Sequence, residues 1–264
     1  LEPIYGQVGQ WEQLIEVNEI KLSTETDPIT RAELLRGIGD LLVEHLGGGE
    51  RAFAAYSRCF KEDPSDRSVR EQLEQLAEEQ SSWEELTSLY EEATQDALDA
   101  TDQLELLLRL GALLDEKLDD RHRAADVYRR AQDLEPDNPE TLGALEKLYT
   151  RGEQWIDLLG IFRRRADLAE TDEERLELVF QVAGLHEEML EDLDEAVSAY
   201  REALTIDPGN AQALSSLDRI FEAQENWAEL ADNLVALLEG AVDADEQVGL
   251  LLRLAGVREL KLLE

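Results

Sequence analysis

The chain has 264 residues, of which 62 are acidic and 25 are basic, so its formal net charge is −37 at pH 7. A charge of this sign opposes attraction to a phosphate backbone or an anionic membrane, and we expect no nucleic acid partner and no direct membrane insertion. The hydrophobic content of 43% is too high for a disordered acidic chain, so the charge is expected on the solvated faces of a folded, soluble protein.

Four tryptophans, at positions 11, 83, 155 and 227, recur with a constant step of 72 residues. The same step relates further residues: Pro64, Pro136 and Pro208; Tyr56, Tyr128 and Tyr200; Ala52, Ala124 and Ala196; Leu73, Leu145 and Leu217. A fixed internal period is the signature of stacked repeats. The sequence predicts one repeat solenoid over residues 1–264, with units 11–82, 83–154 and 155–226 and partial units 1–10 and 227–264. Because both ends interrupt a unit, we expect a fragment of a longer array.

The first hairpin of a unit is clearest between residues 99 and 138. Thr101 or Asp102 is the expected helix cap. An apolar stripe at helical spacing follows, formed by Leu104, Leu107, Leu110, Gly111 and Leu114. A second helix presents one face of Ala124, Val127, Tyr128 and Ala131. Pro136 ends this helix, because proline neither donates a backbone hydrogen bond nor fits the interior of a helix.

The second hairpin begins at Asn138 and Pro139, which read as a cap and a first helical residue. A third helix carries Leu142, Leu145, Leu148 and Tyr149, and a fourth begins at Trp155 with Leu158, Ile161 and Phe162. Each unit is thus two helical hairpins, and the chain is predicted to be all-α, with about fifteen helices and no sheet. We interpret the tryptophans as buried structural anchors between the third and fourth helices.

Small residues at Gly39, Gly111 and Ala183 predict that the first two helices of a unit approach closely. The phrase "RHRAADVYRRAQDLEPDN" and, from Asp192, "DLDEAVSAYREALTIDPGN" resemble the tetratricopeptide repeat family. The resemblance implies a right-handed superhelical α-solenoid that binds other polypeptides. The chain differs from the family by one extra residue in the first hairpin and by a leucine, Leu86, Leu158 or Leu230, three residues after the tryptophan.

By analogy with that family, the first and third helices line a groove that receives a peptide. Positions that differ between units are the candidates for ligand contact, since positions that repeat serve the stack. The predicted groove residues are Leu108, Arg109, Lys147, Arg151, Phe180, Arg219, Leu252 and Arg253. The alternative is that Leu108, Phe180 and Leu252 only pack between hairpins.

No pattern of catalytic or metal-ligating residues is recognisable. His45, His122 and His186 lack partners at ligand spacing and are interpreted as surface residues. The glycines at 47–49 lack the lysine of a phosphate-binding loop and read as a turn. Cys59 is the one cysteine, so no internal disulfide forms, and alanines at the equivalent positions make it a packing residue. We predict no enzyme activity, no cofactor and no metal.

The sequence therefore predicts a non-catalytic scaffold or adaptor that binds a peptide or protein on its concave face. Self-association through the cut repeat ends is a further expectation. Two alternatives stay open: a docking arm of a larger enzyme such as a glycosyltransferase, or a structural element of an envelope or secretion complex. With five lysines among its 25 basic residues, the composition suggests a bacterial source, and the compartment is cytoplasmic or periplasmic.

Overall fold

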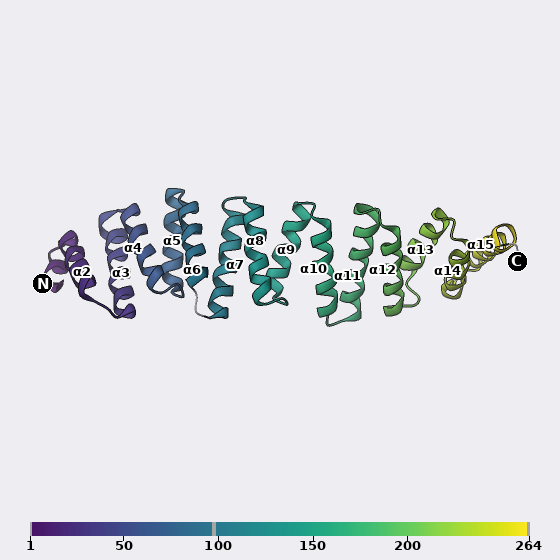
Figure 1. Cartoon of the computed structure of the whole chain (residues 1–264), viewed down its shortest axis with the longest axis horizontal. Coiled ribbons are helices and arrows are strands. Elements are labelled where there is room, and N and C mark those ends of the chain that lie inside the picture. The colour runs from purple at the N-terminus through teal and green to yellow at the C-terminus, as the bar shows by residue number, and fades with distance from the viewer. Residues whose placement is uncertain (1, 97–98, 263–264) are drawn as a thin grey trace. The chain divides into compact units, whose positions relative to one another are not determined.

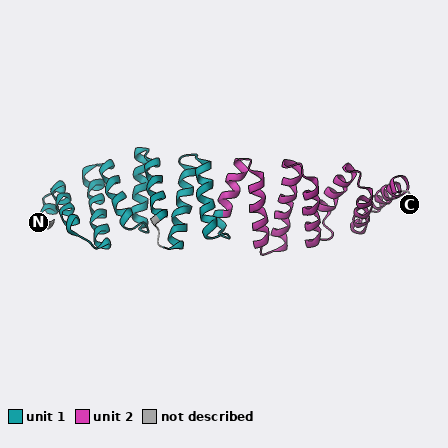
Figure 2. Ribbon diagram, in the orientation of Figure 1, with its two compact units in different colours: residues 1–141 teal, residues 142–264 magenta. Residues whose placement is uncertain are grey.

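The computed structural model describes residues 2–96 and 99–262. This part of the chain contains fifteen α-helices, three π-turns and no strand (Figure 1). The predicted all-α class is confirmed. The helices group into two compact units, Leu1–Thr141 and Leu142–Glu264, each described below by itself (Figure 2).

Helices in both units keep the 72-residue period. The helices that begin in unit 1 are α1 (Glu2–Gln7), α2 (Trp11–Thr24), α3 (Pro28–Leu41), α4 (Gly49–Glu62), α5 (Arg67–Gln80), α6 (Trp83–Asp96), α7 (Ala100–Glu116), α8 (Arg121–Leu134) and α9 (Pro139–Arg151), with the π-turn η1 (Leu42–Leu46). Unit 2 continues with α10 (Trp155–Leu168), α11 (Asp172–Gly184), α12 (Leu193–Ile206), α13 (Ala211–Ala223), α14 (Trp227–Gly240) and α15 (Ala244–Val257), and with η2 (Leu185–Met189) and η3 (Arg258–Leu262).

Consecutive helices pack against each other, as expected for a solenoid of helical hairpins. The most extensive pairs are α3 with α4, α7 with α8, and α11 with α12, which are the first hairpins of successive repeats. Each hairpin also packs on the next one within its unit, as α4 does on α5 and α12 on α13. The stacked-hairpin architecture predicted from the period is confirmed.

The first hairpins turn through a residue with a left-handed backbone, namely Gly47, Asp119 and Glu191 at φ of 60°, 49° and 55°. The turn closes with a backbone hydrogen bond across six positions, from Gly48 to Leu42, Asp120 to Leu114 and Asp192 to His186. Turns before the tryptophans close across five positions, as in a Schellman motif, for example from Gln154 to Tyr149. The first hairpin thus holds the extra residue found in the sequence, and η1 and η2 accommodate it at the ends of α3 and α11.

Side-chain caps also follow the period. The first helices are capped by Asp27, Asp99, Thr171 and Asp243, each accepting hydrogen bonds from backbone N–H groups of the first turn. The cap of α7 is therefore Asp99, and the prediction of Thr101 or Asp102 was wrong, because both donate their backbone N–H to the Asp99 carboxylate. The predicted cap at Asn138 is confirmed by the bond from the Thr141 N–H to Asn138 Oδ1, 3.0 Å long.

The first two helices of a unit approach closely at the predicted glycines. A Cβ on Gly39 would lie 2.6 Å from the Tyr56 ring, and one on Gly111 would lie 2.7 Å from the Tyr128 ring. Cys59 is buried, donates to the Ala32 carbonyl at 3.2 Å, and has a pKa that burial raises to about 11. Both the close approach and the packing role of the cysteine follow the sequence-based expectation.

Two interpretations of single residues were wrong. His186 is not a surface residue: it is 8% exposed, in the position that buried Leu42 and Leu114 occupy in the preceding repeats. The tryptophans are half-buried rather than buried, and each forms the first residue of its helix. The rings of Trp11, Trp83 and Trp227 meet side chains thirty-four residues further along the chain, such as that of His45 on Trp11.

Candidate protein-binding surface

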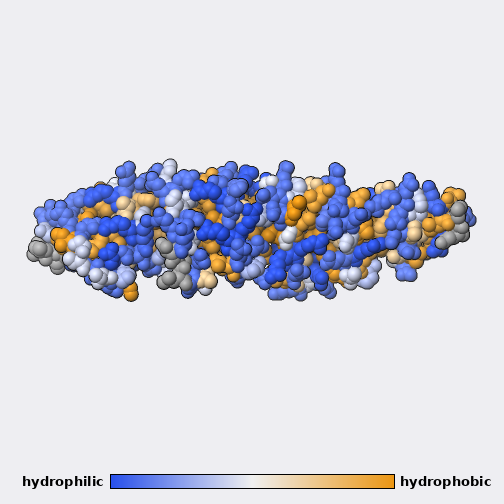
Figure 3. Space-filling view, viewed as in Figure 1, coloured by the Kyte–Doolittle hydropathy of each residue, from blue (hydrophilic) through white to orange (hydrophobic). Residues whose placement is uncertain are grey.

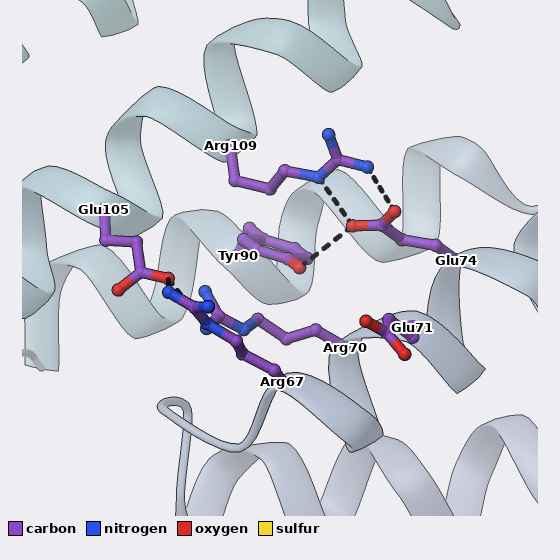
Figure 4. A pocket seen from close by; sticks show the side chains of 7 residues that line it. All are labelled: Arg67, Arg70, Glu71, Glu74, Tyr90, Glu105 and Arg109. Carbon is purple, nitrogen blue, oxygen red and sulfur yellow. Dashed lines mark hydrogen bonds and ion pairs between the residues drawn. The ribbon is translucent and has the colours of Figure 1, made fainter.

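Two adjoining hollows lie on the exposed side of α5 and α7 in unit 1. The larger, of about 240 Å³, is lined by charged side chains of both helices and by Tyr90 of α6 (Figure 4). The second, of about 190 Å³, shares Arg70, Glu105 and Arg109 with the first and adds Leu108. Of the predicted groove residues, Leu108 and Arg109 line the second of these hollows, and their role in binding stays a prediction.

Arg109 does not project into solvent as an isolated cation. Its Nε donates to Glu74 Oε1 at 2.7 Å, and a second guanidinium nitrogen donates to the other carboxylate oxygen. Tyr90 donates to the same carboxylate at 3.3 Å, and Figure 4 shows both side chains directed at Glu74. The hydrogen bond with Glu74 raises the pKa of Arg109, and burial, together with the nearby Glu74 charge, raises the pKa of Tyr90. This bidentate pair holds α5 against α7.

Arg70 forms a second pair with Glu105, from Nη2 to Oε1 at 2.8 Å, and also donates to the Ser65 carbonyl. The arginine is 8% exposed, and the equivalent residues in the next two repeats are the buried leucines Leu142 and Leu214. Unit 1 thus has a buried cation where the other repeats are apolar. A charge in such a position requires partners, and Glu105 supplies one.

Arg67 lies beside Arg70 at the edge of the larger hollow (Figure 4). Its side chain is 81% exposed, and its guanidinium lies 3.7 Å from Glu105, which Arg70 already binds closely. Most donors of Arg67 therefore face water. This arginine, and not Arg109, is the cation best placed to meet a ligand.

A third hollow of about 280 Å³ lies between α3, the end of α4 and the start of α5. Its lining carries four carboxylates and one arginine, Arg36, above the apolar residues Ile29 and Ala32. Two of the carboxylates are already paired, Asp66 with Arg36 at 3.2 Å and Glu62 with Arg31 at 2.7 Å. The surface of unit 1 thus passes from acidic at α3 to mixed charge at α5 and α7.

Unit 2 carries six of the eight predicted groove residues. Phe180 on α11 is half-buried, with its ring centroid 6.1 Å from that of Tyr200, whereas Leu252 on α15 is 69% exposed. Arg219 pairs with Glu187, and Arg253 pairs with Asp218 at 2.9 Å and Glu222 at 3.1 Å. Lys147 and Arg151 are exposed on α9. No single site containing all eight residues is defined, and their role in binding stays a prediction.

Glu187 is engaged by two partners, Arg219 and Tyr200. Burial disfavours its ionised form, but hydrogen bonds from Arg219 and Tyr200 hold its pKa below the ordinary value. The Tyr200 hydroxyl donates to Glu187 at 2.9 Å. The carboxylate thus links α11, through η2, to both α12 and α13.

Sequence reasoning missed Arg67, Arg70 and the acids that hold the arginines. One signal was available: acids recur at Glu74, Glu146 and Asp218, thirty-five residues before Arg109, Gln181 and Arg253. The substitution of arginine for leucine at position 70 was a second signal. Neither is visible in one repeat by itself, because each depends on comparing repeats.

Residues 2–96 and 99–262 contain no group of three or more His, Cys, Asp or Glu side chains placed to hold a metal ion. Within the same ranges, every helix falls short of the length and apolar character needed to cross a bilayer.

Comparison with known proteins identifies one family model and several solved structures that this chain resembles. Residues 188–210 match the family model described as Tetratricopeptide repeat, while comparison with the curated proteins finds no match. The chain is similar to the solved structure of YrrB, a TPR protein with an unusual peptide-binding site, at 19% identity over 70% of this chain and 91% of that chain, with a TM-score of 0.38.

Two further solved structures are similar over most of their length. A tetratricopeptide repeat protein from Parabacteroides merdae has 14% identity, covers 96% of each chain and has a TM-score of 0.37. The TPR2AB domain of yeast Sti1, in a complex with pHSP90, has 12% identity over 86% of this chain and 97% of that chain, with a TM-score of 0.32.

The fold defines the class: this is a helical repeat protein built from stacked hairpins. Residues 188–210, which contain α12, are a tetratricopeptide repeat. The resemblance of the phrase that begins at Asp192 is thereby confirmed.

Proposed function

We propose that the chain is a non-catalytic scaffold that binds a peptide or protein partner on the exposed face of its first and third helices. In unit 1, the hollows at α5 and α7 receive part of that partner. The observation that carries the proposal is Arg70, a cation at the floor of both hollows in a position where the other repeats have leucine. Stacking of the helices does not require this arginine, whereas recognition of a ligand gives it a role.

The chemistry of the hollows indicates the kind of segment that fits. Arg67 offers exposed donors to a carboxylate of the partner, and Leu108 offers an apolar contact beside it. Arg109 is committed to Glu74, so an acidic ligand gains little there without displacing that glutamate. We therefore expect a peptide with an acidic residue next to an apolar one at this point, and the predicted contacts in unit 2 extend the same proposal.

A random peptide library selected on the purified chain tests this function. Affinities of the selected peptides are then measured for the wild type and for Arg67→Glu combined with Leu108→Ala. We expect binding to weaken about tenfold or more in this variant, because it removes a charge partner and an apolar contact together.

Arg121→Glu is the matched control, since it makes the same charge change at an exposed arginine of α8 that pairs with the nearby Asp119. Melting curves of both variants, followed by circular dichroism, establish that each is folded. If the groove variant and the control bind all selected peptides equally well, the proposed surface is wrong.

A further inference from the structure

We use the word corner for a tryptophan together with the residue that follows it and the residue thirty-four positions later. In three corners a cationic or aromatic side chain lies on the ring. His45 stacks on Trp11 at 3.9 Å between centroids, and the ammonium groups of Lys117 and Lys261 lie 4.7 Å and 4.3 Å from the ring centroids of Trp83 and Trp227. A side chain thirty-four positions after the tryptophan thus lies on the ring in each of these three corners.

The first two corners are also closed by ion pairs. Glu12, next to Trp11, binds Arg51 at 2.7 Å, and Glu84, next to Trp83, binds Arg123 at 3.0 Å. Lys117 reaches Glu78 at 2.8 Å in addition to the tryptophan ring. Charged side chains are therefore fully compatible with the geometry of the corner.

The Trp155 corner departs from this pattern at every one of these positions. Ile156 replaces Glu12 and Glu84, Met189 replaces His45 and Lys117, and Glu195 replaces Arg51 and Arg123. Ile156 is 76% exposed and Met189 is 47% exposed, although helix α10 and the turn η2 that carry them are in contact. An apolar surface thus stands where the first two corners form ion pairs.

Exposure alone does not mark a site, because isolated apolar residues are common on protein surfaces. Figure 3 shows hydrophobic residues at several places on the visible face. The Trp155 corner differs in that two neighbouring charged positions have both become apolar while the fold is unchanged. Packing accounts for little of this, since Ile156 is 76% exposed and Met189 is 47% exposed, so the apolar surface is available to a partner.

The charged residues around the Trp155 corner indicate which kind of partner would bind there. Glu153 and Asp157 flank the tryptophan and Ile156 along the chain, and Glu188 and Glu191 flank Met189, with all four exposed. Glu195, at the place of the earlier arginines, adds a fifth carboxylate, although Arg163 lies 3.9 Å from it. Apolar residues inside an acidic rim suit an apolar side chain that has basic neighbours.

We propose that Trp155, Ile156 and Met189 form a docking site for a polypeptide segment that presents one apolar side chain between lysines or arginines. Methionine and tryptophan adapt to the apolar anchor, and the acidic rim attracts the flanking cations. The site is separate from the hollows at α5 and α7, which favour an acidic ligand residue.

Reciprocal exchange between corners tests the site. Ile156→Glu with Met189→Lys installs the residues that the Trp83 corner has at these two positions. A random peptide library is selected for binding to the wild type, and peptides that also bind this variant are removed. The expected peptides carry an apolar residue between basic ones. They bind the variant about tenfold or more weakly and bind the variant of Arg67 and Leu108 unchanged.

The converse variant, Glu84→Ile with Lys117→Met and Arg123→Glu, builds an apolar corner at Trp83. It should bind a second copy of the same peptide in a titration. Circular dichroism melting checks that each variant is folded, and Ile156→Ser alone replaces the double variant if that one unfolds.

Three results would overturn the proposal. One is the absence of any peptide that distinguishes wild type from the corner variant, and another is a consensus rich in acidic residues. The third is concentration-dependent self-association of the wild type in sedimentation that the corner variant abolishes, which would make a second copy of the chain the occupant.

Discussion

Two glycines in α3 should respond to alanine with opposite signs. A Cβ on Gly37 would have no neighbour within 4 Å, so Gly37→Ala gains about 1 kcal/mol of helix propensity at no packing cost. A Cβ on Gly39 would lie 2.6 Å from the Tyr56 ring, about 0.9 Å inside the ~3.5 Å contact of two carbon atoms. Tyr56 cannot withdraw easily, because it is 1% exposed and its hydroxyl donates to Asp40 at 2.7 Å.

Overpacking of this kind costs about 1–3 kcal/mol against a gain of about 1 kcal/mol in propensity, so Gly39→Ala should be less stable than the wild type by up to about 2 kcal/mol. The repeat that naturally has alanine, at position 183, bonds its tyrosine to Glu187, three positions beyond the counterpart of Asp40. The tyrosine hydroxyl of that repeat therefore has a different partner from the one that holds Tyr56.

Urea unfolding followed by circular dichroism measures both variants against the wild type. The midpoint should rise for Gly37→Ala and fall for Gly39→Ala, and both proteins should keep the wild-type helical signal. Equal shifts of the same sign would refute the reasoning, because the two substitutions differ only in the neighbour that the new methyl group meets.

Three further substitutions test other features of the fold. His186→Leu should raise stability by about 1–3 kcal/mol, because Nδ1 of this buried histidine has no hydrogen-bond partner in the described structure, and a lower urea midpoint would show that the nitrogen is satisfied. Glu191→Gly should raise stability by about 0.5–1 kcal/mol, since its φ of 55° strains any side chain but suits glycine, as at Gly47; a loss in thermal melting would contradict this. The pKa of Glu187 lies below its ordinary value of 4.5, so its contribution is present above that pH and is lost as the pH falls through the folded-state value. Glu187→Gln should therefore be less stable at neutral pH and lose less stability than the wild type on acidification, and parallel pH profiles of the two proteins would exclude this role.

Local signals in the sequence accounted for most of the helices. Pro136 marks a helix end because proline has no backbone N–H to donate to a helical hydrogen bond. Asn138 marks a helix start because its side chain accepts a hydrogen bond from the backbone of the first turn. Both signals depend only on residues that are close together in the chain. The constant step between tryptophans identified the repeat without any knowledge of packing. The extra residue in the first hairpin was also visible by alignment, although its accommodation in a π-turn was not.

Tertiary structure decided which side chains of the candidate surface are available. Arg109 appeared in the sequence as a basic neighbour of Leu108, but Glu74 on the preceding third helix engages it in two hydrogen bonds. His186 is followed in the chain by two glutamates, and its burial follows from its packing in the layer of η2 and α12. Such pairings join residues from different helices. The pattern within one helix determines which face a residue occupies, but the neighbouring helix determines whether the charge of that residue is open to a partner.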